Sequence, residues 1–217
     1  DFNLPINFPD YVDKEAKKLN SKISEKEFTK RKDLRKDITF TIDPDDAKDF
    51  DDALSLKINK QDYEIGIHIA DVSHFFNNKS LLNKEAEKRA TSVYLVDRTV
   101  PMLPEKLSND LCSLKPDVDR LTFSVIVKID KEFKMIDKWI GRTVIHSKKR
   151  FTYENAQEVI DKGEGLFSKE LIGLNKIAKH LRKERFKNGS FNFKSNEVKF
   201  LLDDEKKPLQ IVKKERK

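Results

Sequence analysis

The chain has 217 residues and a formal net charge of +7, with 45 Lys and Arg residues against 38 Asp and Glu residues. Hydrophobic residues make up 37% of the chain and include 15 Phe, which supplies bulky core material and argues against disorder. A single cysteine excludes an internal disulfide framework, and no apolar run has membrane-spanning length. We therefore expect a soluble, cytoplasmic protein whose basic charge is compatible with a nucleic-acid partner.

The first half of the chain predicts a lead-in followed by strands and one helix. Residues 1–37 start with a proline-containing extended stretch and continue as a charged helical pattern, which is typical of a linker and helical lead-in. Patterns with strand periodicity follow at 38–43, 53–58 and 63–70. Residues 80–94 place their apolar side chains on one side at helical spacing, which predicts a helix.

The second half predicts a long hairpin, two helices and a strand-rich end. Apolar alternation over 121–129, followed by a charged turn and the run 135–148, indicates the hairpin. Thr152 is a suitable N-cap for a helix ending at Gly163, and a second helix is expected over 166–187. Residues 107–114 predict a short helical turn, and 190–213 short strands. The pattern favours an α+β domain with a mixed or mostly antiparallel sheet and flanking helices.

Six aspartates fall within residues 43–52, which read DPDDAKDFDD and follow the strand pattern directly. At about 4 Å, two like charges repel by about 1 kcal/mol in water and by about 4 kcal/mol at a surface-like dielectric. Such a cluster is cheap only if it spreads into solvent or is neutralised by cations. Carboxylate oxygens are hard ligands and suit Mg²⁺ or Mn²⁺.

Three interpretations of the acidic run compete. It could be an exposed, solvated loop, although the apolar Phe50 inside it favours burial. A calcium-binding EF-hand loop would need Gly and Glu where the chain has Lys48 and Leu54, so that interpretation fails. The third interpretation is a site for phosphodiester hydrolysis, in which two divalent ions bound by converging carboxylates stabilise the attacking and leaving oxygens.

Several motifs follow one another along the chain. The first motif is TIDPDDAKDFDDA at 41–53. The others are IHIADVSH at 67–74, RATSVYL at 89–95, VPMLP at 100–104 and LSNDLCSLKP at 107–116. In this order the motifs resemble those of the RNB-domain exoribonucleases of the ribonuclease II and ribonuclease R family, and ribonuclease R more closely. The resemblance implies an RNB catalytic domain over 38–217. It also implies that this chain is only the N-terminal portion of that domain, without the C-terminal half and its phosphate-contacting arginine.

The resemblance also implies an activity and a set of site residues. The family degrades single-stranded RNA processively from the 3′ end to nucleoside 5′-monophosphates, using Mg²⁺, with Mn²⁺ as a possible substitute. Asp43, Asp49 and Asp52 would then hold metal. Asp51 would be the most catalytically sensitive residue, placing the second metal or the attacking water.

Two aromatic residues match the family positions that grip the RNA. Tyr94 would stack on the terminal base, and Phe193 would close the stack at the other end of the bound 3′ nucleotides. The expected partner is therefore a single-stranded RNA 3′ end, and nothing points to a membrane or to an obligate protein partner. The alternative is a non-catalytic module that binds single-stranded RNA, and activity of this chain alone stays open.

Overall fold

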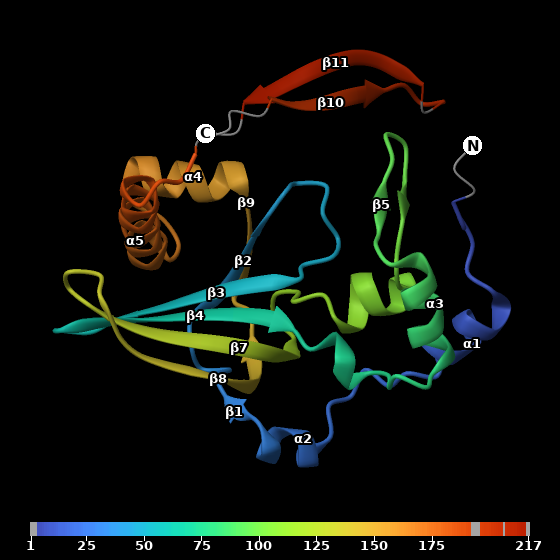
Figure 1. Cartoon of the computed structure of the whole chain (residues 1–217), viewed down its shortest axis with the longest axis horizontal. Coiled ribbons are helices and arrows are strands. Elements are labelled where there is room, and N and C mark those ends of the chain that lie inside the picture. The colour runs from blue at the N-terminus through green and yellow to red at the C-terminus, as the bar shows by residue number, and fades with distance from the viewer. Residues whose placement is uncertain (1–3, 192–195, 206, 216–217) are drawn as a thin grey trace.

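A seven-stranded sheet forms the centre of the protein, which we describe from a computed structural model covering residues 4–191, 196–205 and 207–215 (Figure 1). In spatial order the strands are β1 (Lys32–Asp33), β8 (Met135–His146), β7 (Asp119–Asp130), β4 (Asp62–Ala70), β3 (Asp52–Ile58), β2 (Thr39–Asp43) and β9 (Lys149–Thr152). Only the two outer pairs, β1 with β8 and β2 with β9, are parallel. The expected α+β fold with a mostly antiparallel sheet is confirmed.

The long hairpin β7–β8 and the strands β2, β3 and β4 lie close to the ranges predicted from apolar alternation. β9 was not predicted. Its four residues follow β8 almost directly, and in the sequence they look like a connection to the next helix. They form a strand because they pair in parallel with β2, more than 100 residues earlier in the chain. Local sequence carries no signal for that pairing.

Two helices, α4 (Tyr153–Lys162) and α5 (Ser168–Lys187), pack against one side of the sheet (Figure 1). The Thr152 side chain accepts a hydrogen bond from the Asn155 N–H at 3.0 Å, so the predicted N-cap is confirmed. Gly163 ends α4 in the left-handed conformation, with φ of 73°. Below these helices, Phe40 of β2 packs edge-on against Phe151 of β9.

A second core lies at the opposite end of the molecule. It combines α1 (Asp10–Lys17), α3 (Leu81–Arg89) and the helical turn Leu107–Leu111. Val12, Leu82 and Leu107 are fully buried within it. A further short helix, α2 (Glu25–Lys30), precedes β1. Residues of the expected lead-in thus pack into the domain itself, while the boundary expected at residue 38 stays a prediction.

The helix predicted over residues 80–94 is wrong beyond Arg89. Ala90 has a φ of 63°, which takes the backbone out of the helical region. The following residues form β5 (Val93–Tyr94), which pairs with β6 (Thr99–Val100) in a small separate hairpin. The apolar spacing that suggested a longer helix reflects the packing of α3 followed by a strand.

The strands β10 (Asn196–Leu202) and β11 (Pro208–Glu215) form a hairpin that lies apart from the seven-stranded sheet (Figure 1). The short strands expected near this end of the chain are therefore present. Within the part of the chain that the structure describes, no helix is long and apolar enough to cross a membrane.

A buried polar stripe runs across the strands β3, β4, β7 and β8. His68 of β4 is fully buried and bonds Ser55 at 2.9 Å through Nε2 and Ser124 at 2.8 Å through Nδ1. Thr143 of β8 extends the stripe from Ser124. Gly66 lies under the imidazole, where a Cβ atom would come within 2.5 Å of His68 Nε2. A larger residue at position 66 would therefore displace the ring.

The buried imidazole predicts a loss of stability in mild acid. Burial, with a smaller effect from Lys57, lowers the pKa of His68 from 6.5 to about 4. As the pH falls below 6.5, His68 becomes protonated in the unfolded chain. In the folded chain it becomes protonated only near pH 4. The free energy of unfolding should therefore fall across this window, by a total of about 3 kcal/mol from this group.

Urea unfolding of the parent chain and a His68→Gln variant between pH 7 and pH 4 measures this effect. The parent should lose stability more steeply than the variant as the pH falls below 6.5. Equal slopes for the two proteins would show that His68 is protonated in the folded state or accessible to water.

Candidate active site

The acidic run forms the connection between two neighbouring strands. Asp43 is the last residue of β2 and Asp52 is the first residue of β3, and the acidic loop, residues 44–51, joins them. Because β2 and β3 are antiparallel, the end of one strand lies beside the start of the other. The fold therefore places the aspartates at the end of the sheet where β2 ends and β3 begins.

Asp43 is a buried carboxylate with an unused oxygen. Its exposed fraction is 8%, and its Oδ2 atom has no hydrogen-bond partner among the described residues. Burial raises the pKa of Asp43, and repulsion from Asp52 and Asp49 raises it further. The Thr41 hydroxyl and the Arg150 guanidinium act in the opposite direction. A buried acceptor without a donor is uncommon in proteins and suits a cation.

The same repulsion acts on Asp51. Burial is the largest cause that raises the pKa of this carboxyl, followed by the negative charges of Asp49, Asp52 and Asp43. The four aspartates predicted as site residues therefore influence one another electrostatically. Their charges accumulate in one small region, and a bound cation would remove the resulting penalty.

The donor set fits a hard divalent cation such as Mg²⁺, since all four side chains offer carboxylate oxygens and Asp43 Oδ2 is unpaired among the described residues. In the part of the chain that the structure describes, no three acidic, His or Cys side chains already form a ligand group. Binding an ion would therefore require these carboxylates to turn towards it.

Tyr94 lies next to the acidic loop. Its side chain is on β5, is 70% exposed, and donates a hydrogen bond from its hydroxyl to Asp49 Oδ2 at 3.3 Å. Burial of part of the ring and the charge of Asp49 raise the pKa of the Tyr94 hydroxyl. An aromatic ring that is exposed beside a carboxylate cluster is available to a ligand rather than used in the core. Phe193 lies outside the described residues.

The arginine of the RATSVYL motif has a structural place. The Arg89 side chain is buried and pairs with Glu85 at 2.9 Å. It also donates to the carbonyl oxygens of Asn7 and Pro101 and stacks over the ring of Phe8. All of these contacts are internal, so Arg89 supports the segment that leads into β5 and β6 instead of facing a phosphate.

Two side chains that hold the acidic loop were not singled out from the sequence. Arg150 of β9 donates to the carbonyl oxygens of Pro44 and Asp45 at the start of the loop. Ser113, which follows the Leu107–Leu111 turn, forms hydrogen bonds with the backbone of the acidic loop near the end of that loop. Ser113 lies within the LSNDLCSLKP motif, so the motif marked its neighbourhood, whereas Arg150 had no sequence signal.

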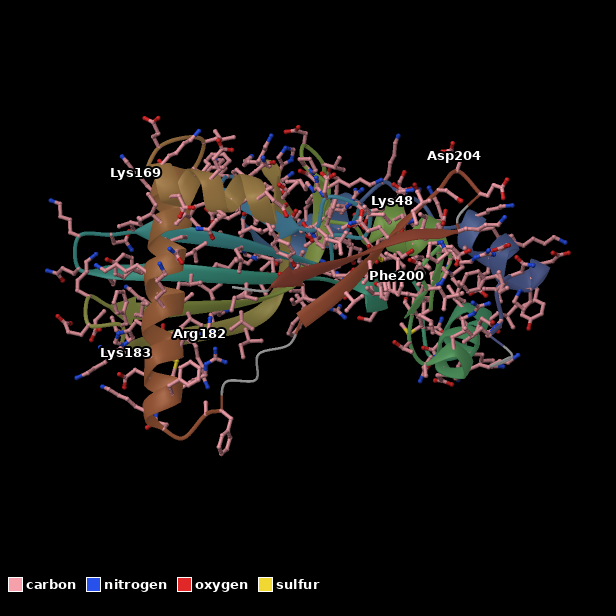
Figure 2. All side chains as sticks on the ribbon, turned by 90° about the horizontal axis from the view of Figure 1, so that it is seen from above. Lys48, Lys169, Arg182, Lys183, Phe200 and Asp204 are labelled. Atoms are coloured by element: carbon pink, nitrogen blue, oxygen red, sulfur yellow. The ribbon has the colours of Figure 1, made fainter. Side chains whose placement is uncertain are left out.

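The strongly basic surface of α5 is separate from this site. In Figure 2 the labelled residues Lys169, Arg182 and Lys183 lie along α5, and Lys48 of the acidic loop lies well away from that helix. The labelled basic residues of α5 therefore lie away from the acidic loop.

The RNB domain family matches residues 31–217, which is most of the chain. The chain therefore belongs to the RNB-domain family of ribonucleases II and R. It is 40% identical to "Ribonuclease R 2" of Lactococcus lactis over 98% of its length and 34% of that protein. It is 41% identical to "DIS3-like exonuclease 2" of Xenopus tropicalis over 92% of its length and 27% of that protein.

Solved structures agree with the sequence comparison. RNase R of Mycoplasma genitalium, in complex with ribose-methylated single-stranded RNA, superposes with a TM-score of 0.91 at 28% identity. That match covers 98% of this chain and 34% of the other. The chain thus spans about a third of the length of the relatives that it matches.

Proposed function

We propose that this chain carries the metal-binding aspartates of a 3′→5′ exoribonuclease that hydrolyses single-stranded RNA to nucleoside 5′-monophosphates. The observation that carries the proposal is the cluster formed by Asp43, Asp49, Asp51 and Asp52, with an exposed tyrosine bonded to it. Family membership supports the reaction class, and the RNA bound in the relative from Mycoplasma genitalium supports the substrate.

Each aspartate has a distinct proposed part. Asp43, at the end of β2, and Asp49 and Asp52 hold the divalent ion with their carboxylate oxygens. Mg²⁺, or Mn²⁺ in its place, supplies charge stabilisation at the scissile phosphate and lowers the pKa of the attacking water. Asp51 would help to hold a second ion or orient that water by accepting a hydrogen bond from it. Because water attacks directly, no covalent bond forms between the protein and the RNA.

Tyr94 is proposed to stack on the 3′-terminal base. Its hydrogen bond to Asp49 connects the base-binding ring to the acidic loop, so the terminal nucleotide would lie beside the carboxylates. Stacking uses the face of the ring and ignores base identity, which suits an enzyme that degrades RNA of any sequence. Phe193 is proposed as the second aromatic, on the strength of its sequence match alone.

Replacing Tyr94 with alanine should weaken RNA binding. Loss of one base stack costs about 1–3 kcal/mol, which corresponds to a roughly 5- to 150-fold higher Kd. Because the side chain is 70% exposed, the fold should be unaffected. Fluorescence anisotropy with a 5′-labelled oligonucleotide, whose 3′ end is free, measures the change, and Tyr94→Phe, which keeps the ring, should stay near the parent value. Equal affinity of the alanine variant and the parent would remove Tyr94 from the binding site.

The proposal is tested with 5′-labelled single-stranded RNA in Mg²⁺ or in chelator. The chain is used alone and also in place of the matching segment of the Lactococcus lactis relative, which supplies the remaining two thirds. We expect metal-dependent shortening from the 3′ end in the chimera. A chimera that binds RNA and leaves it intact, while the relative degrades it, would favour the alternative of a non-catalytic RNA-binding module.

A further inference from the structure

Ser113 connects the acidic loop to the core through its side chain. The residue is fully buried, and its Oγ accepts a hydrogen bond from the Phe50 N–H at 3.1 Å. The same hydroxyl donates to the Lys48 carbonyl oxygen at 3.0 Å. These two backbone groups lie on either side of Asp49. One hydroxyl therefore fixes the backbone immediately before and immediately after a proposed metal ligand.

Backbone hydrogen bonds continue this attachment towards β3. The Leu114 N–H donates to the Phe50 carbonyl oxygen at 2.8 Å, and the Ala70 N–H donates to the Asp51 carbonyl oxygen at 3.0 Å. Two separate segments of the core thus hold the second half of the loop. The Ser113 hydroxyl is the side-chain part of this attachment, so it is the part that a substitution can remove.

Ser113 is itself held in place by a buried arginine. Arg120 of β7 has an exposed fraction of 8%, and its Nε donates to the Ser113 carbonyl oxygen at 2.8 Å. One terminal nitrogen of Arg120 donates to the Asp110 carbonyl oxygen at 2.9 Å. A side chain of the central sheet therefore holds the Ser113 backbone in place.

The loop needs such support because its charges push it apart. Asp49, Asp51 and Asp52 lie within four consecutive positions of the chain, and their like charges repel one another. A backbone free to move would separate the carboxylates, and the energy needed to bring them back would weaken binding of a cation. Buried hydrogen bonds to the backbone oppose that movement.

We propose that Ser113 is a positioning residue that holds Asp49 and Asp51 in the arrangement required for divalent metal binding. The inference rests on the proposed function, because it assumes that these aspartates bind metal. Ser113 does not touch substrate or metal, since its hydroxyl is buried and both of its partners are backbone groups.

Binding of Mn²⁺ to the 217-residue chain tests the inference without any need for catalysis. Free Mn²⁺ is followed by electron paramagnetic resonance during titration of the parent and of Ser113→Ala. We expect the Kd for Mn²⁺ to rise about tenfold, the lower end of the range seen when a group that orients a metal ligand is removed. Hydrogen exchange of the Phe50 amide should also become faster, because its acceptor is lost.

Ser124→Ala is the matched control. Ser124 is also a fully buried serine with hydrogen-bonded partners, but those partners are His68, Thr143 and Thr122, away from the acidic loop. It should lose stability in the same way and bind Mn²⁺ with the parent Kd. If Ser113→Ala does not fold, Ser113→Cys leaves no void, because its sulfur is somewhat larger than the serine oxygen, and its weaker hydrogen-bonding group should shift the Kd in the same direction.

Three outcomes are informative. A raised Kd in the Ser113 variant only, with faster exchange at Phe50, supports the inference. An unchanged Kd in a folded Ser113 variant, or an equal rise in Ser124→Ala, overturns the inference and leaves the metal site intact. Absence of Mn²⁺ binding by the parent chain, or Mn²⁺ binding that Asp49→Asn leaves unchanged, would overturn the proposed metal site and the inference with it.

Discussion

Replacing Asp51 with asparagine should abolish RNA hydrolysis while RNA binding persists. The substitution keeps the shape of the side chain and removes the charge that would orient the attacking water. Loss of a group that acts on the transition state of a metal-assisted hydrolysis costs several kcal/mol, so we expect a decrease of about 10³-fold in the single-turnover rate. The rate is measured with 5′-labelled RNA in the chimera with the Lactococcus lactis relative.

The fold should tolerate this change. The negative charges of Asp49, Asp52 and Asp43 raise the pKa of Asp51, so its ionised form is under repulsion. Removing that charge relieves the repulsion, and the variant should unfold at the same urea concentration as the parent or at a higher one. Loss of activity then cannot be attributed to loss of structure.

Asp45→Asn is the control for the same chemical change in the same loop. The Asp45 side chain is 90% exposed and lies 3.7 Å from Arg150. Its rate should stay within about twofold of the parent, because an exposed pair contributes little. A rate for Asp51→Asn within about tenfold of the parent, or about 1.4 kcal/mol, would mean that the catalytic centre lies elsewhere.

Replacing Asp71 with alanine should cause a large loss of stability. Asp71 Oδ2 lies 2.8 Å from the Arg31 guanidinium, and the two side chains are 3% and 0% exposed. Removing one partner of a buried ion pair leaves the other charge without full compensation, at a cost of about 3–5 kcal/mol. Glu27, 3.1 Å from Arg31, remains as a partner, so we expect about 3 kcal/mol, the lower end.

Urea unfolding of Asp71→Ala and of Asp33→Ala separates buried from exposed pairs. Asp33 pairs with Arg35 at 2.7 Å, but the side chains are 50% and 36% exposed, so its removal should cost less than about 1 kcal/mol. Double replacement of Arg31 and Asp71 should cost less than the two single changes added together. Equal losses in Asp71→Ala and Asp33→Ala would show that the Arg31–Asp71 pair is solvated.

The Arg31–Asp71 ion pair shows that the N-terminal segment forms a buried contact with the sheet region. Arg31 follows α2, within the segment expected to be a linker and helical lead-in, and Asp71 directly follows β4. The composition of residues 1–37 is charged and gives no sign of a buried contact. The two ends of the pair are far apart in the sequence, and only the folded chain brings them together.

Sequence periodicity performed well where burial alternates along a single element. The strand β4 could be predicted because buried and exposed residues alternate along its second half, and the helix α4 because Thr152 and Gly163 mark its two ends. The strand β8 begins with six exposed residues and has three consecutive buried residues near its end, so its prediction depended on its place after the charged turn that follows β7. The prediction over residues 80–94 was wrong because apolar residues at helical spacing continue beyond the residue where Ala90 turns the backbone. A pattern of apolar positions does not record the φ angle of a single residue.

The sequence by itself determined the acidic run, the order of the family motifs and the aspartates that we propose as metal ligands, because these residues are neighbours in the chain. Only the tertiary structure decided what surrounds them: Tyr94 bonded to Asp49, Arg150 at the start of the loop and Ser113 near its end. The physical reason is that local pattern reports which side chains are buried. Contacts across 45 to 105 positions depend on the order and register of the strands, which no local pattern contains.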